Sequence, residues 1–292
     1  MKALVLGGNG FIGRHLSALL SDQHHEVIVG DVTRPPQDCD ERLRFLAVDI
    51  CDVSAVSAAV QAADIVFHSA GVLGTAELFT AIDRAIAVNI GGTATVLQVC
   101  RDFSRPLVYV TLSNDWLNPY SITKQTAARF CEMFRERYGL PVATVVAFNS
   151  YGEGQKTCEI DPASPRKLVP SLIVRALRGE LLEIFGDGEQ QVDLIYAGDV
   201  ASLLAGVAGR SGVFQVGTGK GMSVNEVVAK VLKMTASNSG VVHLPVRPGE
   251  PARSVSVADD IRSSLATGWR PRVTLDDGLA RTIEHYRQVL SH

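Results

Sequence analysis

The chain has 292 residues, of which 28 are Lys or Arg and 31 are Asp or Glu, so its formal net charge is −3. Hydrophobic residues make up 46% and charged residues 20%, which excludes a disordered or fibrous protein. The near-neutral charge provides no basic face of the kind that nucleic acid binding requires, so no nucleic acid partner is expected. The length suits two modest domains or one large α/β unit.

The N-terminal sequence and the cysteines predict a protein of the cytoplasm. The chain begins with one early lysine and a short apolar run broken by glycines, which does not fit a signal peptide. No run of about 18 apolar residues occurs, so we expect no membrane span and no membrane partner. The cysteines are scattered and lack metal-ligand spacing, so we expect reduced thiols and no metal site. They are Cys39, Cys51, Cys100, Cys131 and Cys158.

Short apolar runs alternate with helical patterns through the first half of the chain. Strands are expected at residues 2–6, 26–30, 44–48, 64–68, 107–111 and 142–147. Helices are expected up to residue 20 and at residues 53–63, 81–101 and 120–138. This alternation predicts βαβ units, and therefore an α/β fold with a Rossmann-type, doubly wound parallel sheet covered by helices on both faces.

The rhythm becomes less regular after about residue 149. Residues 151–167 are expected to form a loop and residues 168–179 a helix, followed by a turn-rich stretch and short strands mixed with helices. We therefore predict a first domain over residues 1–150 and a smaller mixed α/β portion over residues 151–292. Segments near residues 190–215 are expected to return to the first domain.

The strongest local signal is a glycine turn, Gly7, Gly10 and Gly13, between the first strand and the first helix. Such a turn lets the backbone approach a pyrophosphate at the positive end of a helix. Asp31 ends the second expected strand, where a carboxylate accepts hydrogen bonds from an adenosine ribose and repels a 2′-phosphate. NAD is therefore the predicted cofactor, with NADP kept as an alternative because Arg34 lies close by.

Tyr120 and Lys124 are four residues apart, so they share one face of an expected helix. A lysine cation near a phenol lowers the phenol pKa. Such a tyrosine moves a proton on a substrate hydroxyl while a hydride passes to nicotinamide. The YxxxK spacing is common by chance, and it equally describes an exposed Tyr and Lys. Its combination with the glycine turn and Asp31 favours catalysis.

With these features the chain resembles the extended short-chain dehydrogenase/reductase family, in its NAD-dependent nucleotide-sugar epimerase/dehydratase branch. The resemblance covers nearly the whole chain. Beyond the residues already named, the matching segments are 49–50, 68–71, 89–93, Ser113, 148–152, 184–188, 225–226, 247–250 and 268–271. The resemblance also implies a homodimer packed through helices at about residues 84–101 and 120–138.

The resemblance implies a role for each matched residue. Tyr120 is the expected general acid/base, Lys124 holds the nicotinamide ribose, and Ser113 binds the reacting oxygen of the sugar. The implied NAD contacts are Gly7, Gly10, Phe11, Ile12, Gly13, Asp31, Asp49, Ile50, Ala70, Gly71, Asn89, Tyr120 and Lys124. The implied nucleotide-sugar contacts are Ser113, Asn149, Leu168, Phe185 and Arg247. Phe185 equally suits a core position, and Arg247 a solvated loop.

Three departures from the family pattern concern the substrate. The loop between Ser113 and Tyr120 is short, and Val192 stands where an arginine commonly grips the diphosphate. Val146 and Ala147 stand where Arg-Pro is frequent. Valine cannot replace a bidentate hydrogen-bond donor. The cations that are conceivable substitutes are Arg166, Lys167, Arg175 and Arg253.

The residues after Ser113 bear on the reaction. Sugar 4,6-dehydratases of this family carry an acidic pair there, whereas this chain has Asn114 and Asp115, so one carboxylate remains. We therefore predict a nucleotide-sugar epimerase that acts at C4 through a transient 4-keto intermediate. The alternatives are a nucleotide-sugar 4,6-dehydratase, an NAD(P)-dependent reductase or dehydrogenase of the same family, and a non-catalytic NAD-binding member.

Overall fold

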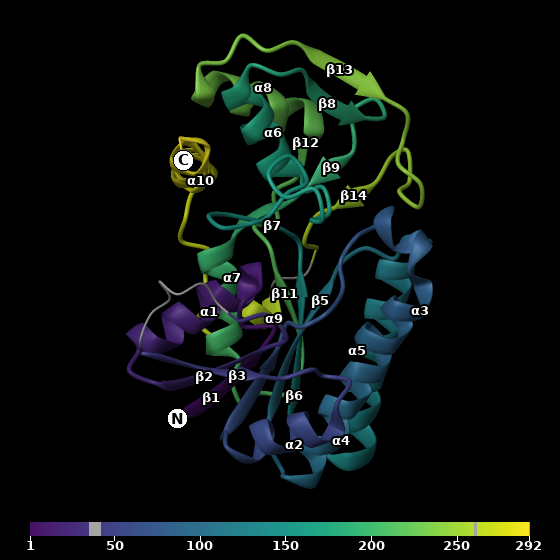
Figure 1. Ribbon diagram of the computed structural model, residues 1–292, viewed down its shortest axis with the longest axis vertical. Helices are drawn as coiled ribbons and strands as arrows, with labels where there is room; N and C mark the ends of the chain where they lie inside the picture. Colours follow the sequence, from purple (N-terminus) through teal and green to yellow (C-terminus); the bar gives the residue numbers. More distant parts are fainter. Residues whose placement is uncertain (35–41, 260–261, 292) are drawn as a thin grey trace.

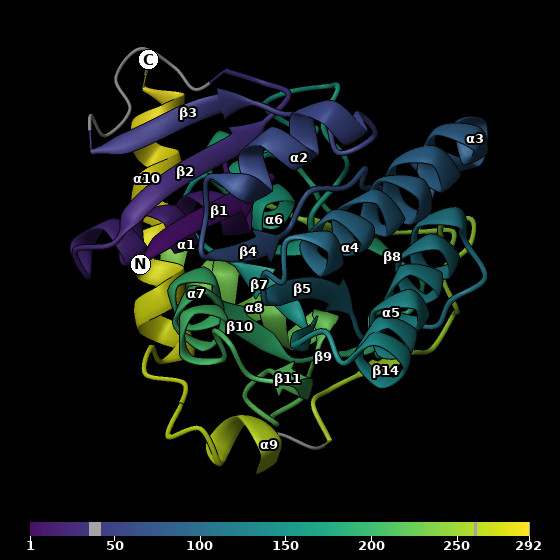
Figure 2. The ribbon, with the colours of Figure 1, turned by 90° about the horizontal axis from the view of Figure 1, so that it is seen from below.

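The computed structural model describes residues 1–34, 42–259 and 262–291, so Cys39 lies outside the described residues. Its central feature is a parallel sheet of seven strands in the order β11-β6-β5-β4-β1-β2-β3 (Figure 2). The strands are β1 (Lys2–Leu6), β2 (Glu26–Asp31), β3 (Leu43–Ala47), β4 (Ile65–His68), β5 (Leu107–Leu112), β6 (Val142–Ala147) and β11 (Gly212–Val216). The predicted Rossmann-type sheet is confirmed.

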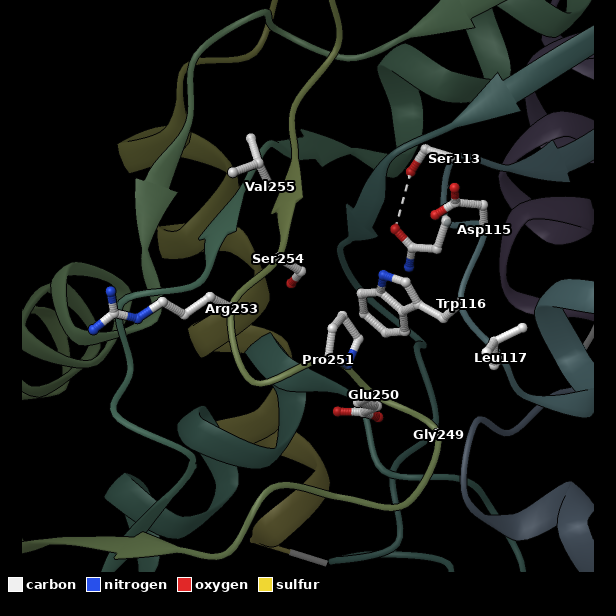
Figure 3. A pocket seen from close by; sticks show the side chains of 11 residues that line it. Ser113, Asp115, Trp116, Leu117, Gly249, Glu250, Pro251, Arg253, Ser254 and Val255 are labelled. Carbon is white, nitrogen blue, oxygen red and sulfur yellow. Dashed lines mark hydrogen bonds between the residues drawn. The ribbon is translucent and has the colours of Figure 1, made fainter.

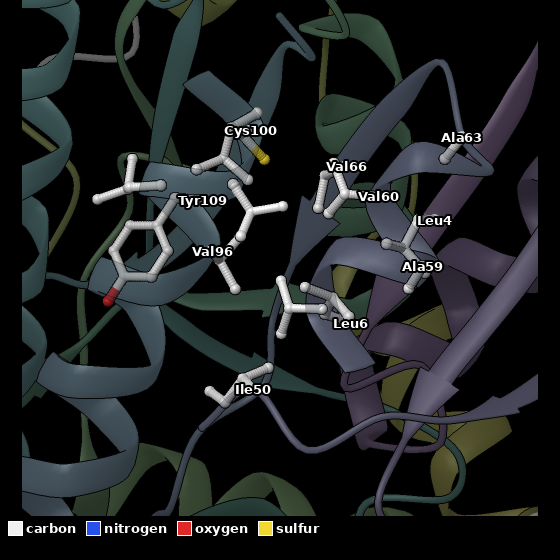
Figure 4. Close-up of a cluster of buried hydrophobic side chains, with 14 of the residues drawn as sticks. Leu4, Leu6, Ile50, Ala59, Val60, Ala63, Val66, Val96, Cys100 and Tyr109 are labelled. Carbon is white, nitrogen blue, oxygen red and sulfur yellow. The ribbon is translucent and has the colours of Figure 1, made fainter. Parts of the chain in front are cut away.

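Helices cover both faces of this sheet because alternate strand residues point to opposite sides. Leu4 and Leu6 pack against α2 (Val53–Gln61), α4 (Thr93–Asp102) and α5 (Pro119–Tyr138), as Figure 4 shows for the inner part of this cluster. Ala3 and Val5 face the other side, which α1 (Phe11–Asp22) and α7 (Ala197–Gly206) cover. Strands buried on both faces explain the short, continuous apolar runs in the sequence.

The second half of the chain forms three small sheets and a third core (Figure 1, upper part). The sheets are β7 (Asn149–Tyr151) with β10 (Leu194–Tyr196), β9 (Gln191–Val192) with β12 (Met222–Ser223) and β14 (Val255–Ser256), and β8 (Leu182–Phe185) with β13 (Val241–Leu244). The core lies among α6 (Leu168–Arg178), α8 (Val224–Thr235) and α10 (Leu275–Leu290). α7 and β11, from residues 197–216, join the first sheet and its helices, and the short α9 (Arg262–Leu265) contacts β11.

The helix expected at residues 81–101 is present, but it is not a regular α-helix throughout. After the one-turn η1 (Glu77–Thr80), the structure has α3 (Ile82–Ala85), a π-helical segment η2 (Ile86–Gly92) and then α4. A π-helical turn inserts extra backbone into an otherwise regular helix and is frequent at functional sites. Here it places Asn89 against the loop that follows β4, as described below.

The parallel strands all end toward the second half of the molecule (Figure 1). In open α/β sheets, ligands bind at the carboxyl ends of the strands, where the strand order reverses. In this sheet that place is the edge beyond β1 and β4, which lie side by side. We therefore expect a ligand to bind at the loops that follow β1, β4, β5 and β6. Among the described residues, no helix has the length and apolar character that crossing a bilayer demands.

Candidate active site

The glycine turn brings three segments into backbone contact. A Cβ at Gly7, which has φ 77°, would lie 2.5 Å from the Ala70 nitrogen, and a Cβ at Gly13 would lie 2.1 Å from the Gly7 oxygen. Only glycine fits such approaches. The N-cap of α1, Gly10, supplies no side-chain hydrogen bond to the first turn. The free N–H groups of that turn are therefore available to an anion such as a pyrophosphate.

Asp31 holds the glycine turn to the end of β2. Its carboxylate accepts hydrogen bonds from the Asn9 and Thr33 backbone nitrogens, each at 3.0 Å. Asp49, exposed after β3, accepts one from the Cys51 nitrogen at 2.9 Å. Both carboxylates lie at the carboxyl edge of the sheet, which is the side where an adenosine binds in such folds.

Three predicted cofactor residues have apolar contacts within the protein. Ile50 is 4% exposed and packs on Gly92, where a Cβ would lie 2.6 Å from its side chain. Ile12 lies at the edge of the core beneath α1, and the Phe11 ring meets the His15 ring edge-on. The side chains at these three predicted positions are therefore engaged within the protein.

Asn89 fixes the loop after β4 to the helix α5. Its buried amide accepts a hydrogen bond from the Val72 nitrogen at 2.9 Å and donates to the Val72 oxygen at 3.1 Å. It also donates to the Thr123 hydroxyl at 3.0 Å, one residue before Lys124. Gly71 lies beneath this amide, because a Cβ there would lie 2.8 Å from the Asn89 oxygen. The Asn89 side chain therefore positions the cofactor loop through protein contacts.

The catalytic helix α5 is capped by Asn118. The Asn118 side chain accepts a hydrogen bond from the Ser121 nitrogen at 2.8 Å, and Pro119 occupies the first turn. The same amide donates to the Gly249 oxygen at 2.9 Å. This one side chain therefore ties the start of the helix that carries Tyr120 to the segment that carries Arg247.

Tyr120 and Lys124 are both in environments that disfavour charge. Burial raises the pKa of the Tyr120 phenol to about 12, and burial lowers the pKa of the Lys124 ammonium to about 8. The Lys124 ammonium donates to the Val110 oxygen at 2.7 Å and lies 4.3 Å from the Tyr109 ring centroid. At neutral pH the phenol is therefore protonated and the lysine is charged.

Ser113 belongs to a hydroxyl cluster that sequence analysis missed in part. Its Oγ lies 3.0 Å from the Ser256 Oγ, and the two share a hydrogen bond. The Ser256 hydroxyl also accepts a hydrogen bond from the Asn149 amide at 3.4 Å. Ser256 is 143 positions from Ser113 and belongs to no motif, so nothing in the sequence could have identified it. The structure thus brings two predicted substrate residues together through a third.

A cavity of about 530 Å³ opens beside Ser113 (Figure 3). The short loop of residues 113–117 forms one wall and residues 249–255 the other, as Figure 3 shows. The charged lining residues are Asp115, Glu250 and Arg253. A volume of this size suits a small-molecule site. The short loop therefore contributes Asp115 and Trp116 to the wall of an open cavity.

Arg247 is held by two carboxylates near Phe185. Its guanidinium donates to Glu77 at 2.8 Å and to Glu250 at 3.1 Å, and lies 5.7 Å from the Phe185 ring centroid. Burial pushes the Glu77 pKa upward, but hydrogen bonds and the Arg247 charge hold it below its usual value. The Arg166 guanidinium lies 5.3 Å from the same ring. Leu168, at the start of α6, packs at the edge of the third core.

Val192 lies in the wall of the third core and is 8% exposed. Of the four substitute cations, Arg253 is the one that lines the cavity. Its side chain is 78% exposed, points out of the cavity in Figure 3, and pairs with Asp187 at 3.1 Å. Arg166 and Arg175 instead pair with Glu159. Within the described part of the chain, no group of three or more His, Cys, Asp or Glu side chains is placed to hold a metal ion.

Comparisons with known proteins find similarity over almost the whole chain. The sequence pattern described as the NAD dependent epimerase/dehydratase family matches residues 3–217. A dTDP-glucose 4,6-dehydratase of Shigella flexneri is 27% identical over 344 residues, which cover 98% of this chain and 92% of that protein.

Two solved structures are also similar to this chain. A UDP-glucose 4-epimerase of Thermotoga maritima with UDP-glucose has a TM-score of 0.90 and 27% identity, covering 99% of this chain and 100% of that one. The UDP-glucose 4-epimerase of Thermus thermophilus, in complex with NAD, has a TM-score of 0.86 and 26% identity, covering 98% and 99%. The similarity therefore extends to proteins that carry two different reaction names.

Proposed function

The chain belongs to the NAD dependent epimerase/dehydratase family, and from this premise we propose that it is a nucleotide-sugar epimerase that inverts C4 through a transient 4-keto intermediate. The observation that carries the choice of reaction is the wall of the cavity after Ser113. On this wall the neighbour of Asp115 is Asn114, and the other carboxylate that lines the cavity, Glu250, pairs with Arg247 at 3.1 Å. A 4,6-elimination needs one group to remove the C5 proton and another to protonate the leaving hydroxyl, and an amide does neither.

The family is NAD dependent, and the residues at the carboxyl edge of the sheet fit this cofactor. The close approach of Gly7, Gly13 and Ala70 leaves the open N-terminus of α1 for the pyrophosphate. Asp31 suits the ribose hydroxyls, and its charge disfavours the additional phosphate of NADP. When bound, NAD supplies the acceptor and donor of the C4 hydride.

The side chains of this chain would move and hold the proton of the C4 hydroxyl. Tyr120 removes that proton as the sugar is oxidised and returns it on reduction, while the Ser113 hydroxyl binds the C4 oxygen. A phenol with a pKa near 12 needs a positive charge beside it to act as a base at neutral pH. Lys124, one turn along the same helix, is the cation that this chain provides. The 4-keto sugar turns over within the cavity of about 530 Å³ before it is reduced.

The similarity to proteins that act on UDP- and dTDP-sugars supports a nucleotide-sugar substrate. The test is incubation of the purified protein with NAD and a panel of UDP-, dTDP- and GDP-sugars, followed by chromatography of the products. We expect one sugar to give a mixture of its two C4 epimers with no net NADH. A 4-keto-6-deoxy product that absorbs in alkali would instead establish a dehydratase. Binding of NAD without conversion of any sugar would refute the proposal.

We also propose a homodimer that packs through α4 and α5. Exposed apolar side chains lie on α5 and on the neighbouring α3 and η2, among them Ile82, Ile86, Ile122, Phe130 and Tyr138. Light scattering should give twice the mass of the chain, and Phe130→Asp should shift the protein toward the monomer. Arg129→Asp, at the neighbouring exposed position, is the charge-matched control for a nonspecific surface effect. A monomeric wild-type protein at high concentration would contradict this proposal.

A further inference from the structure

A second cavity of about 260 Å³ adjoins the one beside Ser113, and we call it the side chamber. The two cavities share Ser113 and Val255 as lining residues. The other residues of the side chamber are Val146, Phe148, Gln215, Ser256, Val257 and Asp259. The side chamber therefore adjoins the Ser113 hydroxyl, which in the proposed function binds the reacting oxygen of the sugar.

Val146, the second-last residue of strand β6, lines the side chamber with a short side chain. Val146 and Gln215 are register partners on the neighbouring parallel strands β6 and β11, so their side chains lie on the same face of the sheet. Gln215 extends across this face to Asp259, with its amide donating to the Asp259 carboxylate at 2.8 Å. Valine has no reach of this kind, and the space beside it stays open to the cavity wall at Ser113.

The lining of the side chamber is polar and has one sign of charge. Among its described lining residues, Asp259 is the one that is charged, and none is a cation. The hydroxyls of Ser113 and Ser256 also line the side chamber and already share a hydrogen bond. A group that enters the side chamber therefore meets a carboxylate and hydroxyl oxygens, which accept hydrogen bonds from it. An anionic group would meet the like charge of Asp259, which the described lining does not offset.

We propose that the side chamber is a specificity subsite for a sugar substituent that donates hydrogen bonds, with an amino group preferred over a hydroxyl and a carboxylate excluded. The subsite rests on the proposed function, because it takes a substituent of the same sugar that is bound beside Ser113. It also assigns Val146 and Asp259 to substrate selection. A charged hydrogen bond to a carboxylate is stronger than a neutral one, which sets the order of preference.

The experiment measures binding to the NAD-loaded full-length protein by titration calorimetry. The probes are UDP, UDP-glucose, its derivatives with an amino group at C2 or at C6, and UDP-glucuronic acid. For the wild type, we expect one of the amino sugars to bind about tenfold more tightly than UDP-glucose, and the uronic acid about tenfold more weakly. Asp259→Asn retains the size of the side chain and should bring both ratios to within about twofold of one. Asp83→Asn, at an exposed position on α3, is the matched control and should leave both ratios unchanged.

A second variant tests the space itself. Val146→Arg places a long cation in the side chamber, next to Asp259, and should remove the preference for the amino sugar while UDP alone binds as it does to the wild type. If Asp259→Asn and Val146→Arg both retain the wild-type ratios, the subsite does not exist, although the proposed function stands. If none of UDP, dTDP and GDP binds to the wild type, the nucleotide-sugar function fails, and this inference fails with it.

Discussion

The cofactor side and the sugar side of the site are built in different ways. On the cofactor side, β1, the glycine turn and α1 are continuous in sequence, and backbone atoms approach so closely that Gly7 and Gly13 admit no side chain. On the sugar side, Ser113, Asn149 and Ser256 come from three distant segments, and side-chain hydrogen bonds join these three residues to one another. Backbone contacts leave little freedom, whereas side-chain contacts can be exchanged one at a time. The departures from the family pattern fall on the sugar side, at Val146 and Val192.

The largest effect is expected at Tyr120, the proposed general acid/base. Tyr120→Phe removes the proton-transferring oxygen and leaves the ring in its half-buried place. We expect kcat to fall about a thousandfold, within the range of general acid–base catalysis, while the affinity for NADH changes less than about threefold. Tyr138→Phe, at the exposed end of the same helix, is the control. Retention of more than a tenth of the wild-type kcat would remove Tyr120 from the chemistry and favour a non-catalytic role for the chain.

The next effect tests the rigidity of the cofactor side. Gly13→Ala places a methyl group 2.1 Å from the Gly7 oxygen, and this backbone atom cannot yield cheaply. We expect a loss of about 1–3 kcal/mol in the free energy of unfolding and at least a tenfold rise in the NAD dissociation constant. Gly206→Ala, at the end of α7, meets no atom within 4 Å and should be neutral or stabilising by up to about 1 kcal/mol. Equal behaviour of the two variants in calorimetry would show that the turn is not sterically restricted.

The sequence predicted the strands of the large sheet well because their determinants are local. The apolar runs of β1 and β6 were predicted at the residues where the strands lie, since parallel strands are buried on both faces. The π-helical segment inside the helix expected at residues 81–101 was not predicted, for a non-local reason. Asn89 hydrogen bonds to Val72, 17 positions away, and sits within the π-helical segment that interrupts the helix. Periodicity carries no signal for such a bond.

The contacts on the sugar side could not be predicted from the sequence because they join residues that are even farther apart in the chain. Arg247 was predicted to contact the nucleotide, but its pairing with Glu77, 170 positions away, follows from the fold alone. Ser256 and Asp259 lie in no motif, and their place beside Ser113 and Gln215 depends on how β14 joins the small sheet of β9. The sequence therefore indicated some of the residues on the sugar side, but it did not indicate which residues they contact.

A substitution of Lys124 can measure how much the burial of its charge lowers the free energy of unfolding. Its pKa falls from 10.5 to about 8 because the ammonium is buried, which corresponds to about 3 kcal/mol. Replacing Lys124 by Met removes this cost but also the hydrogen bond to Val110, so we expect the cofactor-free protein to gain about 2 kcal/mol at pH 7. Activity should be lost in the same variant.

The pH dependence of this gain has a definite sign. Between pH 8 and 10.5 the unfolded chain holds the Lys124 proton more firmly than the folded chain does, so wild-type stability rises with pH in this window. The advantage of Lys124→Met should therefore be full below pH 8 and shrink as the pH approaches 10.5. Lys233→Met, at an exposed position of α8, should show no such trend in denaturant titrations. A gain that does not change with pH would mean that packing, and not the buried charge, is its source.

The smallest expected effect tests whether Arg253 replaces the arginine that the family commonly has at the position of Val192. Arg253 lines the cavity but its guanidinium pairs with Asp187 at 3.1 Å on the surface. A diphosphate would have to draw it away from this partner, which is easy because exposed ion pairs contribute little. Arg253→Ala should therefore raise the KM of the nucleotide sugar about five- to tenfold with little change in kcat, since the contact is the same in the ground and transition states.

Asp187→Asn should act in the opposite direction. It retains the hydrogen bond that the Asp187 side chain accepts from the Glu189 nitrogen, but it releases Arg253. We expect a KM about twofold lower than that of the wild type and a steeper loss of affinity with salt, because the freed guanidinium now meets the diphosphate alone. Arg129→Ala, which breaks an exposed pair with Glu132 far along α5, controls for net charge. If Arg253→Ala and Arg129→Ala have the same KM, Arg253 does not replace the arginine that the family commonly has at the position of Val192. The diphosphate would then depend on Arg247, although Arg247 is paired with two carboxylates.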